Sequence, residues 1–302
     1  MKFLVLSRKP AIYSTRRLRE AARIEGHGCL VVDPLRCVLH LEGGVAKVRV
    51  AGEDLTGIDA VIPRVGSYAV EYALAVVRQF EMMGVPVLNS AAGIALAKQK
   101  WASLQALAAR GIPVPPTTLM RFPTHLADTI EELGGSPVIL KLLRGMQGAG
   151  VLLAESTEAA ESIMDTVWSL GEDILAQKFI AECRGRDVRV LVIGGEAVAA
   201  MRRKAKEGDF RSNIHRGGVG ERVELTRELR ELAVKAVEVV GLRVAGVDLL
   251  ESRNGLVVLE VNSSPGFQGL EEATDKDIAG EMVKEAEKLA LKGEDQFRIL
   301  NF

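Results

Sequence analysis

Three oxygen-bearing side chains lie in two apolar segments near the C-terminus. Asp248 belongs to VAGVDLL, whereas Glu260 and Asn262 belong to LVVLEVNSSPG and share one face if that segment is a β-strand. A carboxylate in an apolar strand is costly unless a cation pairs with it. Because Mg²⁺ prefers hard oxygen ligands and shares its shell with substrate phosphates, the pattern predicts a magnesium site. Salt bridges to nearby arginines are the alternative.

The register of these two segments makes the prediction testable. A strict two-residue turn at Asn254 and Gly255 would pair Asp248 with Val261 and place the acids on opposite faces of the hairpin. A shared metal site therefore requires an odd-length loop or a β-bulge, so that Asp248 lies opposite Glu260 or Asn262.

A glycine-rich segment, KLLRGMQGAGV, runs from Lys141 to Val151 and contains Gly145, Gly148 and Gly150. Glycines let backbone N–H groups approach phosphate oxygens, and Lys141 adds a positive charge. The Lys-Ser/Thr pair of a Walker A loop is absent, and the next residues, VLLAES, are typical of a strand. The HRD and DFG motifs that a kinase needs are absent as well. The segment is thus a phosphate-binding hairpin loop or a plain turn.

A basic segment, MRRKAKEGDFRSNIHRGG, occupies residues 201–218. It could be a solvated face, a nucleic-acid patch, or a clamp over ATP phosphates and an acidic substrate. Its one aromatic residue, Phe210, disfavours a base-stacking platform. Glycines at Gly208 and at 217–218 would permit a mobile flap. Because the glycine-rich segment and the carboxylates lie in the same part of the chain, the clamp is favoured.

The elements that must position these groups change type along the chain. Residues 1–95 alternate strands with helices, which predicts an α/β, mainly parallel, Rossmann-like sheet with strands FLVLS, CLVVD, DAVIP and VPVLN. This part lacks the GxGxxG that a dinucleotide needs. After the helix-breaking IPVPP, paired strands and helices predict an α+β arrangement. The length of 302 residues predicts two or three domains.

Composition excludes several classes of protein. The 302 residues carry 39 Lys and Arg against 40 Asp and Glu, so the net charge of -1 disfavours direct nucleic-acid binding by the whole molecule. The three cysteines include no CxxC, which suits a reducing cytoplasm. The first apolar run is too short for a signal peptide, and no apolar stretch is long enough to cross a membrane.

The order of these segments is specific. A lysine-bearing strand with GMQGAGV, then AQKFI, DVRVLVIGG, KEGDFRSNIHRGG and GVDLL…LEVNSSPG resembles ATP-grasp carboxylate–amine ligases of the RimK type, over the full chain. The resemblance implies an ATP-grasp fold with an N-terminal Rossmann-like pre-ATP-grasp domain. The pre-ATP-grasp domain would occupy residues 1–96, and the central and C-terminal ATP-grasp subdomains would occupy 97–177 and 178–302. Enzymes of this type add glutamate to the C-terminus of ribosomal protein S-six.

The resemblance also implies roles for single residues. Residues implied to bind ATP are Lys100, Lys141, Lys178, Phe179, Asp187, Arg211, Ser212 and Asn213. The implied phosphate loop comprises Gly145, Gly148 and Gly150; arginines near the transferred phosphate are Arg189 and Arg203; and metal ligands are Asp248, Glu260 and Asn262. The sequence departs from similar proteins at Lys178, where Glu is common, and at Met146, where Ser or Thr is common.

The implied activity is a ligase reaction through an acylphosphate. ATP and Mg²⁺ or Mn²⁺, with two ions, would be its cofactors. Glutamate and the acidic C-terminal tail of a ribosomal protein would be its partners, and a cytoplasmic homo-oligomer such as a tetramer its form. Two alternatives stay open at this point. One is a related ligase that glutamylates a small-molecule cofactor or an amino-acid carrier protein, and the other is a non-catalytic ATP-binding module.

Overall fold

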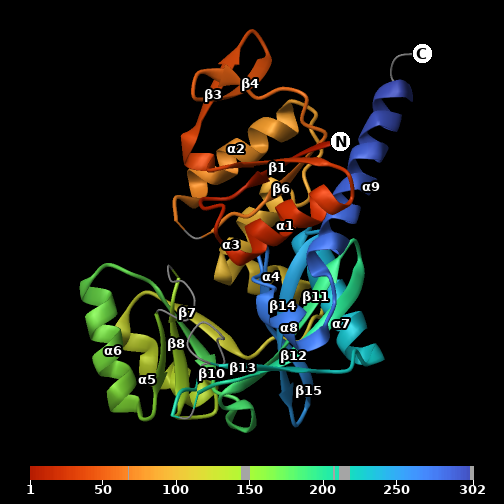
Figure 1. Ribbon diagram of the computed structural model, residues 1–302. Coiled ribbons are helices and arrows are strands. Elements are labelled where there is room, and N and C mark those ends of the chain that lie inside the picture. The colour runs from red at the N-terminus through yellow and green to blue at the C-terminus, as the bar shows by residue number, and fades with distance from the viewer. Residues whose placement is uncertain (67, 144–149, 207, 211–217, 300–302) are drawn as a thin grey trace.

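The computed structural model describes residues 1–66, 68–143, 150–206, 208–210 and 218–299, with side chains described as far as residue 292. Three groups of elements are visible in Figure 1: an N-terminal group at the top, a four-stranded sheet at the lower left and a five-stranded sheet at the lower right. The fold is mixed α/β, as the sequence predicts.

The N-terminal group is built on a parallel sheet in the order β2-β1-β6, which is typical of a Rossmann-like arrangement. An antiparallel sheet, β3-β4-β5, projects from it and has no counterpart in the sequence prediction. The elements of the N-terminal group are β1 (Lys2–Leu6), α1 (Tyr13–Ile24), β2 (Gly28–Val32), a 3-10 turn (Pro34–Arg36), β3 (Cys37–Glu42), β4 (Val45–Val50), β5 (Glu53–Asp54), β6 (Ala60–Pro63) and α2 (Val70–Met82).

The predicted fourth strand, VPVLN, is wrong. Only Val87 forms a parallel bridge, to Val61, and the chain then enters α3 (Ala91–Lys98), which Ser90 caps by accepting a hydrogen bond from the Gly93 N–H. The reason is local, because Pro86 has no N–H to continue a ladder of hydrogen bonds. A second helix, α4 (Lys100–Ala109), follows immediately.

The four-stranded sheet is antiparallel, in the order β7-β10-β8-β9. Helices α5 and α6 cover it, and together they enclose a hydrophobic core that includes Ile130, Leu140 and Met164. Its elements are β7 (Thr117–Met120), a 3-10 turn (Pro123–His125), α5 (Leu126–Glu132), β8 (Val138–Leu142), β9 (Val151–Ala154), α6 (Thr157–Ser169) and β10 (Ile174–Lys178).

The five-stranded sheet is antiparallel, in the order β13-β12-β11-β14-β15. Val188 and Val190 lie in one hydrophobic cluster with α7, whereas Leu191 and Ile193 lie in another with Phe267 and α9. Its elements are a 3-10 turn (Ala181–Cys183), β11 (Arg186–Ile193), β12 (Glu196–Lys204), β13 (Val219–Arg222), α7 (Arg227–Val240), β14 (Val244–Ser252), β15 (Gly255–Asn262), α8 (Gln268–Thr274) and α9 (Ile278–Ile299).

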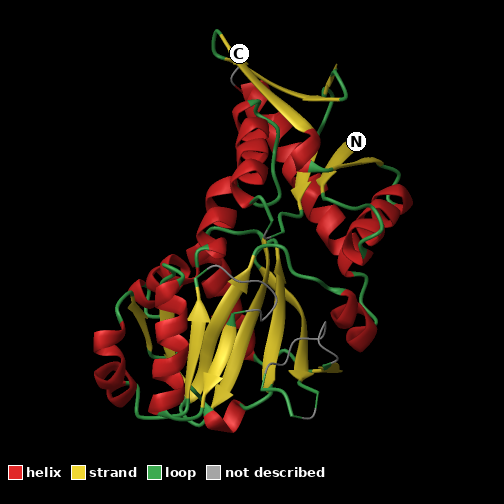
Figure 2. Cartoon of the chain, turned by 90° about the vertical axis from the view of Figure 1, so that its left-hand side faces the viewer, coloured by secondary structure: helices red, strands yellow, loops and turns green. Residues whose placement is uncertain are grey.

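The N-terminal group is joined firmly to the five-stranded sheet. Both of the hydrophobic clusters at that sheet contain N-terminal residues, such as Leu4 in one and Phe3 in the other, whereas the core of the four-stranded sheet contains none. Both chain ends lie in the upper part of the molecule in Figures 1 and 2, because α9 returns alongside the N-terminal group. The five-stranded sheet, which carries Asp248 and Glu260, therefore shares its hydrophobic core with the N-terminal group.

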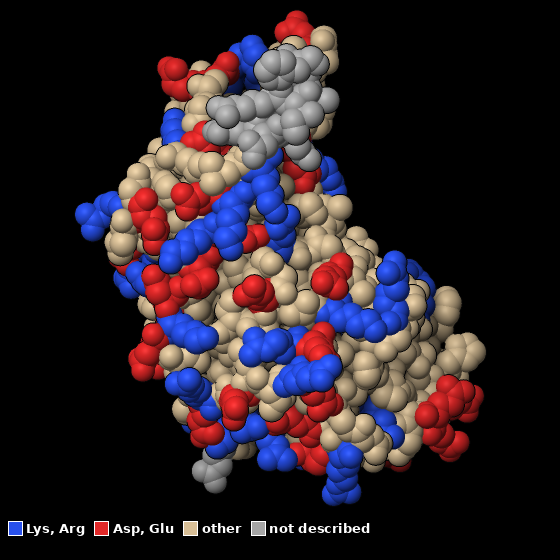
Figure 3. All heavy atoms as spheres, turned by 90° about the vertical axis from the view of Figure 1, so that its right-hand side faces the viewer, with Lys and Arg blue, Asp and Glu red and all other residues tan. Residues whose placement is uncertain are grey.

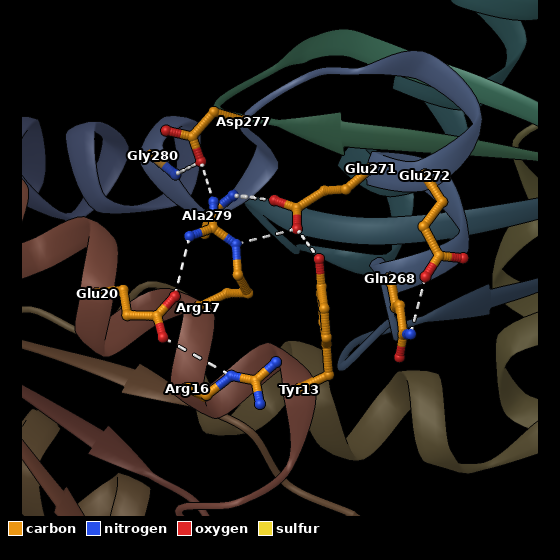
Figure 4. A network of polar contacts seen from close by, with 10 residues as sticks. All are labelled: Tyr13, Arg16, Arg17, Glu20, Gln268, Glu271, Glu272, Asp277, Ala279 and Gly280. Atoms are coloured by element: carbon orange, nitrogen blue, oxygen red, sulfur yellow. Dashed lines mark hydrogen bonds and ion pairs between the residues drawn. The ribbon is translucent and has the colours of Figure 1, made fainter.

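Polar contacts strengthen the same junction, as Figure 4 shows. The Glu271 carboxylate on α8 accepts hydrogen bonds from the Tyr13 hydroxyl (2.7 Å) and from Arg17 Nε (3.2 Å), both on α1. Arg17 also donates to Asp277 (2.9 Å), which precedes α9. Because Glu271 is almost fully buried, these bonds are shielded from solvent and hold α1 against α8 and α9.

The surface carries charges of both signs. On the face in Figure 3, lysine and arginine side chains alternate with acidic ones, so the described part of this face presents no continuous basic surface. No helix among the described residues combines the length and apolar character needed to cross a bilayer.

Candidate functional site

The site begins with an irregularity between β14 and β15. Ser252 pairs with Gly255 across a two-residue turn at Arg253 and Asn254, one residue earlier than predicted. A β-bulge at Leu259 then shifts the register, so Asp248 pairs with Glu260 and Gly246 with Asn262. The predicted bulge is thus confirmed, and directly opposed residues point to the same face. Without the bulge, Asp248 would face Leu259.

The bulge also preserves the hydrophobic core. Val258 and Val261 are both buried although they are three residues apart, whereas a regular strand would bury residues separated by an even number. The extra residue, Leu259, lets both valines pack inward while Glu260 and Asn262 point to the opposite face.

Asp248 is held by two arginines from neighbouring strands. Arg189 on β11 donates to both carboxylate oxygens, Nε to Oδ1 at 2.6 Å and its terminal nitrogen to Oδ2 at 2.7 Å. Arg203 on β12 approaches Oδ2 to 2.8 Å. These cations hold the pKa of the buried Asp248 carboxyl well below its usual range, against the effect of burial. The salt-bridge alternative from the sequence therefore describes how Asp248 is held here.

Asp187 completes the row of charges. It lies two residues before Arg189 on β11, opposite Arg203, which donates to both of its carboxylate oxygens. Arg203 is buried and bonded to both Asp187 and Asp248, and their charges raise the pKa of its guanidinium. The carboxylate of Asp187 therefore holds Arg203 in place. If Asp187 also contacted a nucleotide, it would do so with a carboxylate that is already paired with Arg203.

Glu260 has a different environment from Asp248. Its carboxylate accepts a hydrogen bond from Asn262 Nδ2 (2.9 Å) and forms no ion pair with another described residue. The Glu260 side chain is exposed to solvent at one side. Partial desolvation of its carboxylate by the surrounding protein, together with the charge of Asp248, raises the pKa of Glu260. Asn262 Nδ2 also lies 3.4 Å from Asp248 Oδ2, so the three predicted ligands converge.

The donor set suits a hard divalent cation. It offers two carboxylates and an amide, which are hard oxygen ligands. Groups of three or more His, Cys, Asp or Glu side chains that could hold a softer metal are absent from the described residues. A cation beside Glu260 would offset the repulsion from Asp248 that raises the pKa of Glu260. The two carboxylates therefore fit Mg²⁺, whereas the Asn262 amide turns its Nδ2 toward both of them, so its oxygen would reach the same ion only after the amide flips.

Two lysines approach these acids from outside the five-stranded sheet. Lys141 lies on β8, and burial lowers the pKa of its ammonium to about 8, although the charge of Glu260 acts in the opposite direction. Lys100, at the start of α4, donates to the carbonyls of Leu142 and Leu143, both at 3.0 Å, and burial also lowers its pKa. Positive charge is thus concentrated opposite Glu260.

The remaining described candidates lie at the end of β10 and at the glycine-rich segment. The Lys178 N–H donates to the Pro116 carbonyl (2.9 Å) and its side chain is exposed, while Arg184 stacks 5.9 Å from the Phe179 ring centre. Gly150 adopts a φ of +77°, which favours glycine, and its carbonyl accepts from the Leu142 N–H (2.8 Å). Predicted site residues that lie outside the described part are Gly145, Gly148, Arg211, Ser212 and Asn213, as does Met146.

Sequence reasoning missed two cations in this region, Arg64 and Lys98. The charges of Arg64 and Glu260 both influence the pKa of Lys98, so these groups lie near one another although they are far apart in sequence. The signal that could have found Arg64 is its place directly after the apolar strand DAVIP, at the carboxyl end of a predicted parallel strand.

Comparisons with known proteins cover the whole chain. Residues 1–94 match the model of the RimK PreATP-grasp domain, and residues 97–286 match that of the RimK-like ATP-grasp domain. A probable alpha-L-glutamate ligase of Thioalkalivibrio sulfidiphilus (strain HL-EbGR7) is 48% identical over 99% of both chains. One from Syntrophotalea carbinolica (strain DSM 2380 / NBRC 103641 / GraBd1) is 47% identical over 99% of both chains.

Solved structures agree with this comparison. The ATP-grasp ligase PsnB, complexed with a minimal precursor, superposes with a TM-score of 0.76 at 26% identity, over 96% of this chain and 99% of PsnB. A RimK domain ATP-grasp protein from Sphaerobacter thermophilus DSM 20745 gives a TM-score of 0.74 at 25% identity, over 95% of this chain and 99% of that chain. Another PsnB structure contains precursor, Mg and ADP.

Proposed function

The chain belongs to the RimK-like ATP-grasp family and is an ATP-dependent glutamate ligase, and from this premise we propose that it adds glutamate to the C-terminal carboxylate of an acidic protein tail, as on ribosomal protein S-six. The observation that carries the proposal is the row of Asp248, Glu260 and Asn262 on one sheet face, with Lys141 and Lys100 opposite. Acids that can hold a divalent cation and lysines that can pair with phosphates suit a nucleoside triphosphate with its metal ion.

The residues divide into three roles in this proposal. Lys141 and Lys100 bind the phosphates of ATP, with Gly150 in the loop that approaches them. Asp248, Glu260 and Asn262 hold Mg²⁺ or Mn²⁺, in a site for two ions. When bound, the metal neutralises charge on the phosphoryl oxygens. Arg189 and Arg203 lie beside the acids and stabilise the transferred phosphate while they orient Asp248.

The hinge residues and the basic segment complete the assignment. The backbone of Lys178 and Phe179 lies at the end of β10, where it borders the adenine in this proposal, so the Lys178 side chain is not needed for the contact. Asp187 is only 6% exposed, so in this proposal it reaches the ribose with the same carboxylate that holds Arg203. We extend the phosphate contacts to Gly145 and Gly148, and the flap contacts to Arg211, Ser212 and Asn213, by family membership alone.

The reaction then proceeds in two transfers. An oxygen of the acceptor carboxylate attacks the γ-phosphorus of ATP, the bond to the bridging oxygen breaks, and ADP leaves. The deprotonated α-amine of glutamate attacks the resulting acylphosphate carbon, and inorganic phosphate leaves as the amide forms. Charge develops on phosphoryl oxygens in both transfers, so arginine, lysine and metal stabilise it without a covalent nucleophile.

The test is mass spectrometry of acceptor peptides after incubation with ATP, Mg²⁺ and glutamate. We expect a ladder of added glutamate residues on a peptide that ends in glutamate, and none on the same peptide with an amidated C-terminus. Absence of any ladder on acidic tails, together with mass gain on a small-molecule or carrier-protein acceptor, would contradict the proposal. ATP binding without ADP release would instead favour a non-catalytic module.

A peptide acceptor is favoured over a small-molecule acceptor by one comparison. PsnB, which matches this chain along nearly its whole length, is complexed with a minimal precursor in one structure and with that precursor, Mg and ADP in another. The cytoplasm, where ribosomal proteins are made, is the matching location, and a homo-oligomer such as a tetramer is the proposed assembly.

A further inference from the structure

A second polar cluster lies where the N-terminal parallel sheet meets the five-stranded sheet. Strand β1 pairs with β2 on one side and β6 on the other, so the order of strands reverses around β1. In open parallel sheets, ligands bind at the carboxyl ends of strands next to such a reversal. Arg64 directly follows β6 there, and its N–H donates to the Leu6 carbonyl at the end of β1 (2.9 Å).

Arg64 reaches from this edge to the chain that follows the proposed metal ligands. Its guanidinium donates to the Pro265 carbonyl (2.6 Å) and to Ser14 Oγ (3.2 Å) on α1, and it lies 5.7 Å from the Phe267 ring centre. No carboxylate in the described part of the chain pairs with it. Burial without a counter-charge lowers the pKa of Arg64 to about 10, so its positive charge is uncompensated.

Lys98 supplies a second cation at the same place. It ends α3, which Gly93 lets approach α7 closely, since a Cβ there would collide with the Gly241 carbonyl. The partly buried Lys98 ammonium makes no hydrogen bond or ion pair with any described residue. Burial and the Arg64 charge lower the pKa of Lys98, whereas the charge of Glu260 raises it, so its ammonium lies near both groups.

Two buried hydroxyls lie on the segment that Arg64 contacts. Ser263 and Ser264 follow Asn262 and precede Pro265, whose carbonyl Arg64 contacts. Their Oγ atoms are buried and have no hydrogen-bond partner among the described residues, and Ser263 is only 3% exposed. Asn89 fixes the backbone, because its Nδ2 donates to the carbonyls of Ser263 (3.0 Å) and Val244 (2.7 Å). Buried hydroxyls without partners are costly, which points to a ligand that accepts from them.

These groups differ from the arginines of the adjacent row. Arg189 and Arg203 are neutralised by Asp248 and Asp187, whereas neither Arg64 nor Lys98 pairs with an acid among the described residues, although the charge of Glu260 influences Lys98. Two uncompensated cations beside two hydroxyl donors complement an anion with several acceptor oxygens. The ATP phosphates already have Lys141 and Lys100 as partners in the proposed function.

We propose that Arg64, Lys98 and the Ser263–Ser264 pair form a subsite for a carboxylate of the incoming glutamate. The inference rests on the proposed function and names the part of the site that holds the amino-acid substrate. Ser263 directly follows the proposed metal ligand Asn262, so a carboxylate bound there places the amine of the same small molecule beside the phosphorylated acceptor. The subsite thus orients the nucleophile for the second transfer.

Steady-state kinetics of Lys98→Met tests the subsite, because Lys98 has no described contact whose loss would disturb the fold. We expect the KM for glutamate to rise about tenfold or more, since a charge-assisted interaction of this kind is lost, while the KM values for ATP and acceptor peptide change less than about twofold. Lys98→Arg should recover much of the affinity. Lys235→Met, at an exposed lysine of α7, is the matched control and should leave all three KM values unchanged.

Direct binding gives a readout that does not depend on turnover. Calorimetric titration of glutamate into the enzyme with ADP and Mg²⁺ should show weaker binding for Lys98→Met and for Arg64→Lys than for wild type. An unchanged glutamate affinity in both variants, or a rise confined to the KM of the acceptor, would overturn the subsite. If wild-type enzyme adds no glutamate to any acceptor, the proposed function fails first; if it does and both variants match it, only the subsite fails.

Discussion

The four-stranded and five-stranded sheets present their charges in opposite ways. The five-stranded sheet shares its hydrophobic clusters with the N-terminal group, and its arginines and acids are bonded to one another across β11, β12 and β14. The four-stranded sheet has a core of its own and contributes Lys141, whose charge no bonded acid neutralises within the described residues. The five-stranded sheet therefore holds a pre-organised cluster of acids, and the four-stranded sheet supplies a lysine whose charge a bound polyanion can neutralise.

A similar contrast separates the two acids of the cluster. Asp248 is buried and bonded to two arginines, whereas Glu260 faces solvent and, within the part of the chain that the structure describes, is bonded only to the Asn262 amide. Asp248 is therefore tied to the stability of the sheet, and Glu260 is available for chemistry. Substitutions that separate turnover, stability and ATP affinity test this division.

Glu260→Gln should have the largest effect. We expect turnover to fall about 1,000-fold, because the variant loses a carboxylate beside the transferred charge. The thermal midpoint of unfolding should not fall, because the repulsion between Glu260 and Asp248 is relieved. Glu251→Gln on the neighbouring strand β14, which removes the same charge from an exposed pair with Arg202, is the control and should keep near-normal turnover. Near-normal turnover in Glu260→Gln would remove the metal assignment.

Asp248→Asn should reduce stability as well as turnover. We expect the free energy of unfolding to fall by about 3 kcal/mol at neutral pH, because Arg189 and Arg203 lose a buried counter-charge, although Asp187 still pairs with Arg203. Because the folded pKa of Asp248 is lowered, the stabilisation is present above the ordinary Asp range and is lost as the pH falls below it. Denaturant unfolding of both proteins should show the gap narrowing in acid, and a constant gap would contradict this.

Lys141→Met tests the opposite side. We expect the KM for ATP to rise about tenfold or more, with the thermal midpoint unchanged or raised because an uncompensated buried charge is gone. The KM for glutamate should stay within about twofold of wild type. If ATP affinity survives, the four-stranded sheet does not supply the phosphate charge that the comparison assigns to it.

The pH dependence of ATP use should show the smallest effect. Lys141 carries its charge below about pH 8 in the free enzyme, with the charges of Glu260 and Asp248 raising the pKa of the ammonium and that of Lys100 lowering it. We therefore expect kcat/KM for ATP to decline as the pH rises through about 8. In Lys141→Arg the decline should move to higher pH, because a guanidinium keeps its proton. An unchanged profile in that variant would assign the decline to another group.

Several features were predictable from residues that lie near one another in sequence. The parallel N-terminal sheet and the bulge that unites Asp248 with Glu260 are confirmed, because alternation and hairpin register are local properties. The strand VPVLN was wrong, because an apolar run with strand-forming residues did not reveal that Pro86 interrupts pairing. The sheet β3-β4-β5 went unnoticed, although CVLHLE and VAKVRV are rich in strand-forming residues and Gly43-Gly44 between them is a hairpin turn signal.

The sequence by itself determined the types of chemical group, the strands that carry them and the family to which they belong, because these depend on short-range patterns. Only the tertiary structure decided which acid is neutralised, which cations remain uncompensated and which hydroxyls are buried without partners. Arg64 and Ser264 are separated by 200 positions along the chain. Nevertheless, the Arg64 guanidinium donates a hydrogen bond to the carbonyl of Pro265, which directly follows Ser264. Burial and charge compensation depend on all surrounding atoms, and those are assembled only when distant segments pack together.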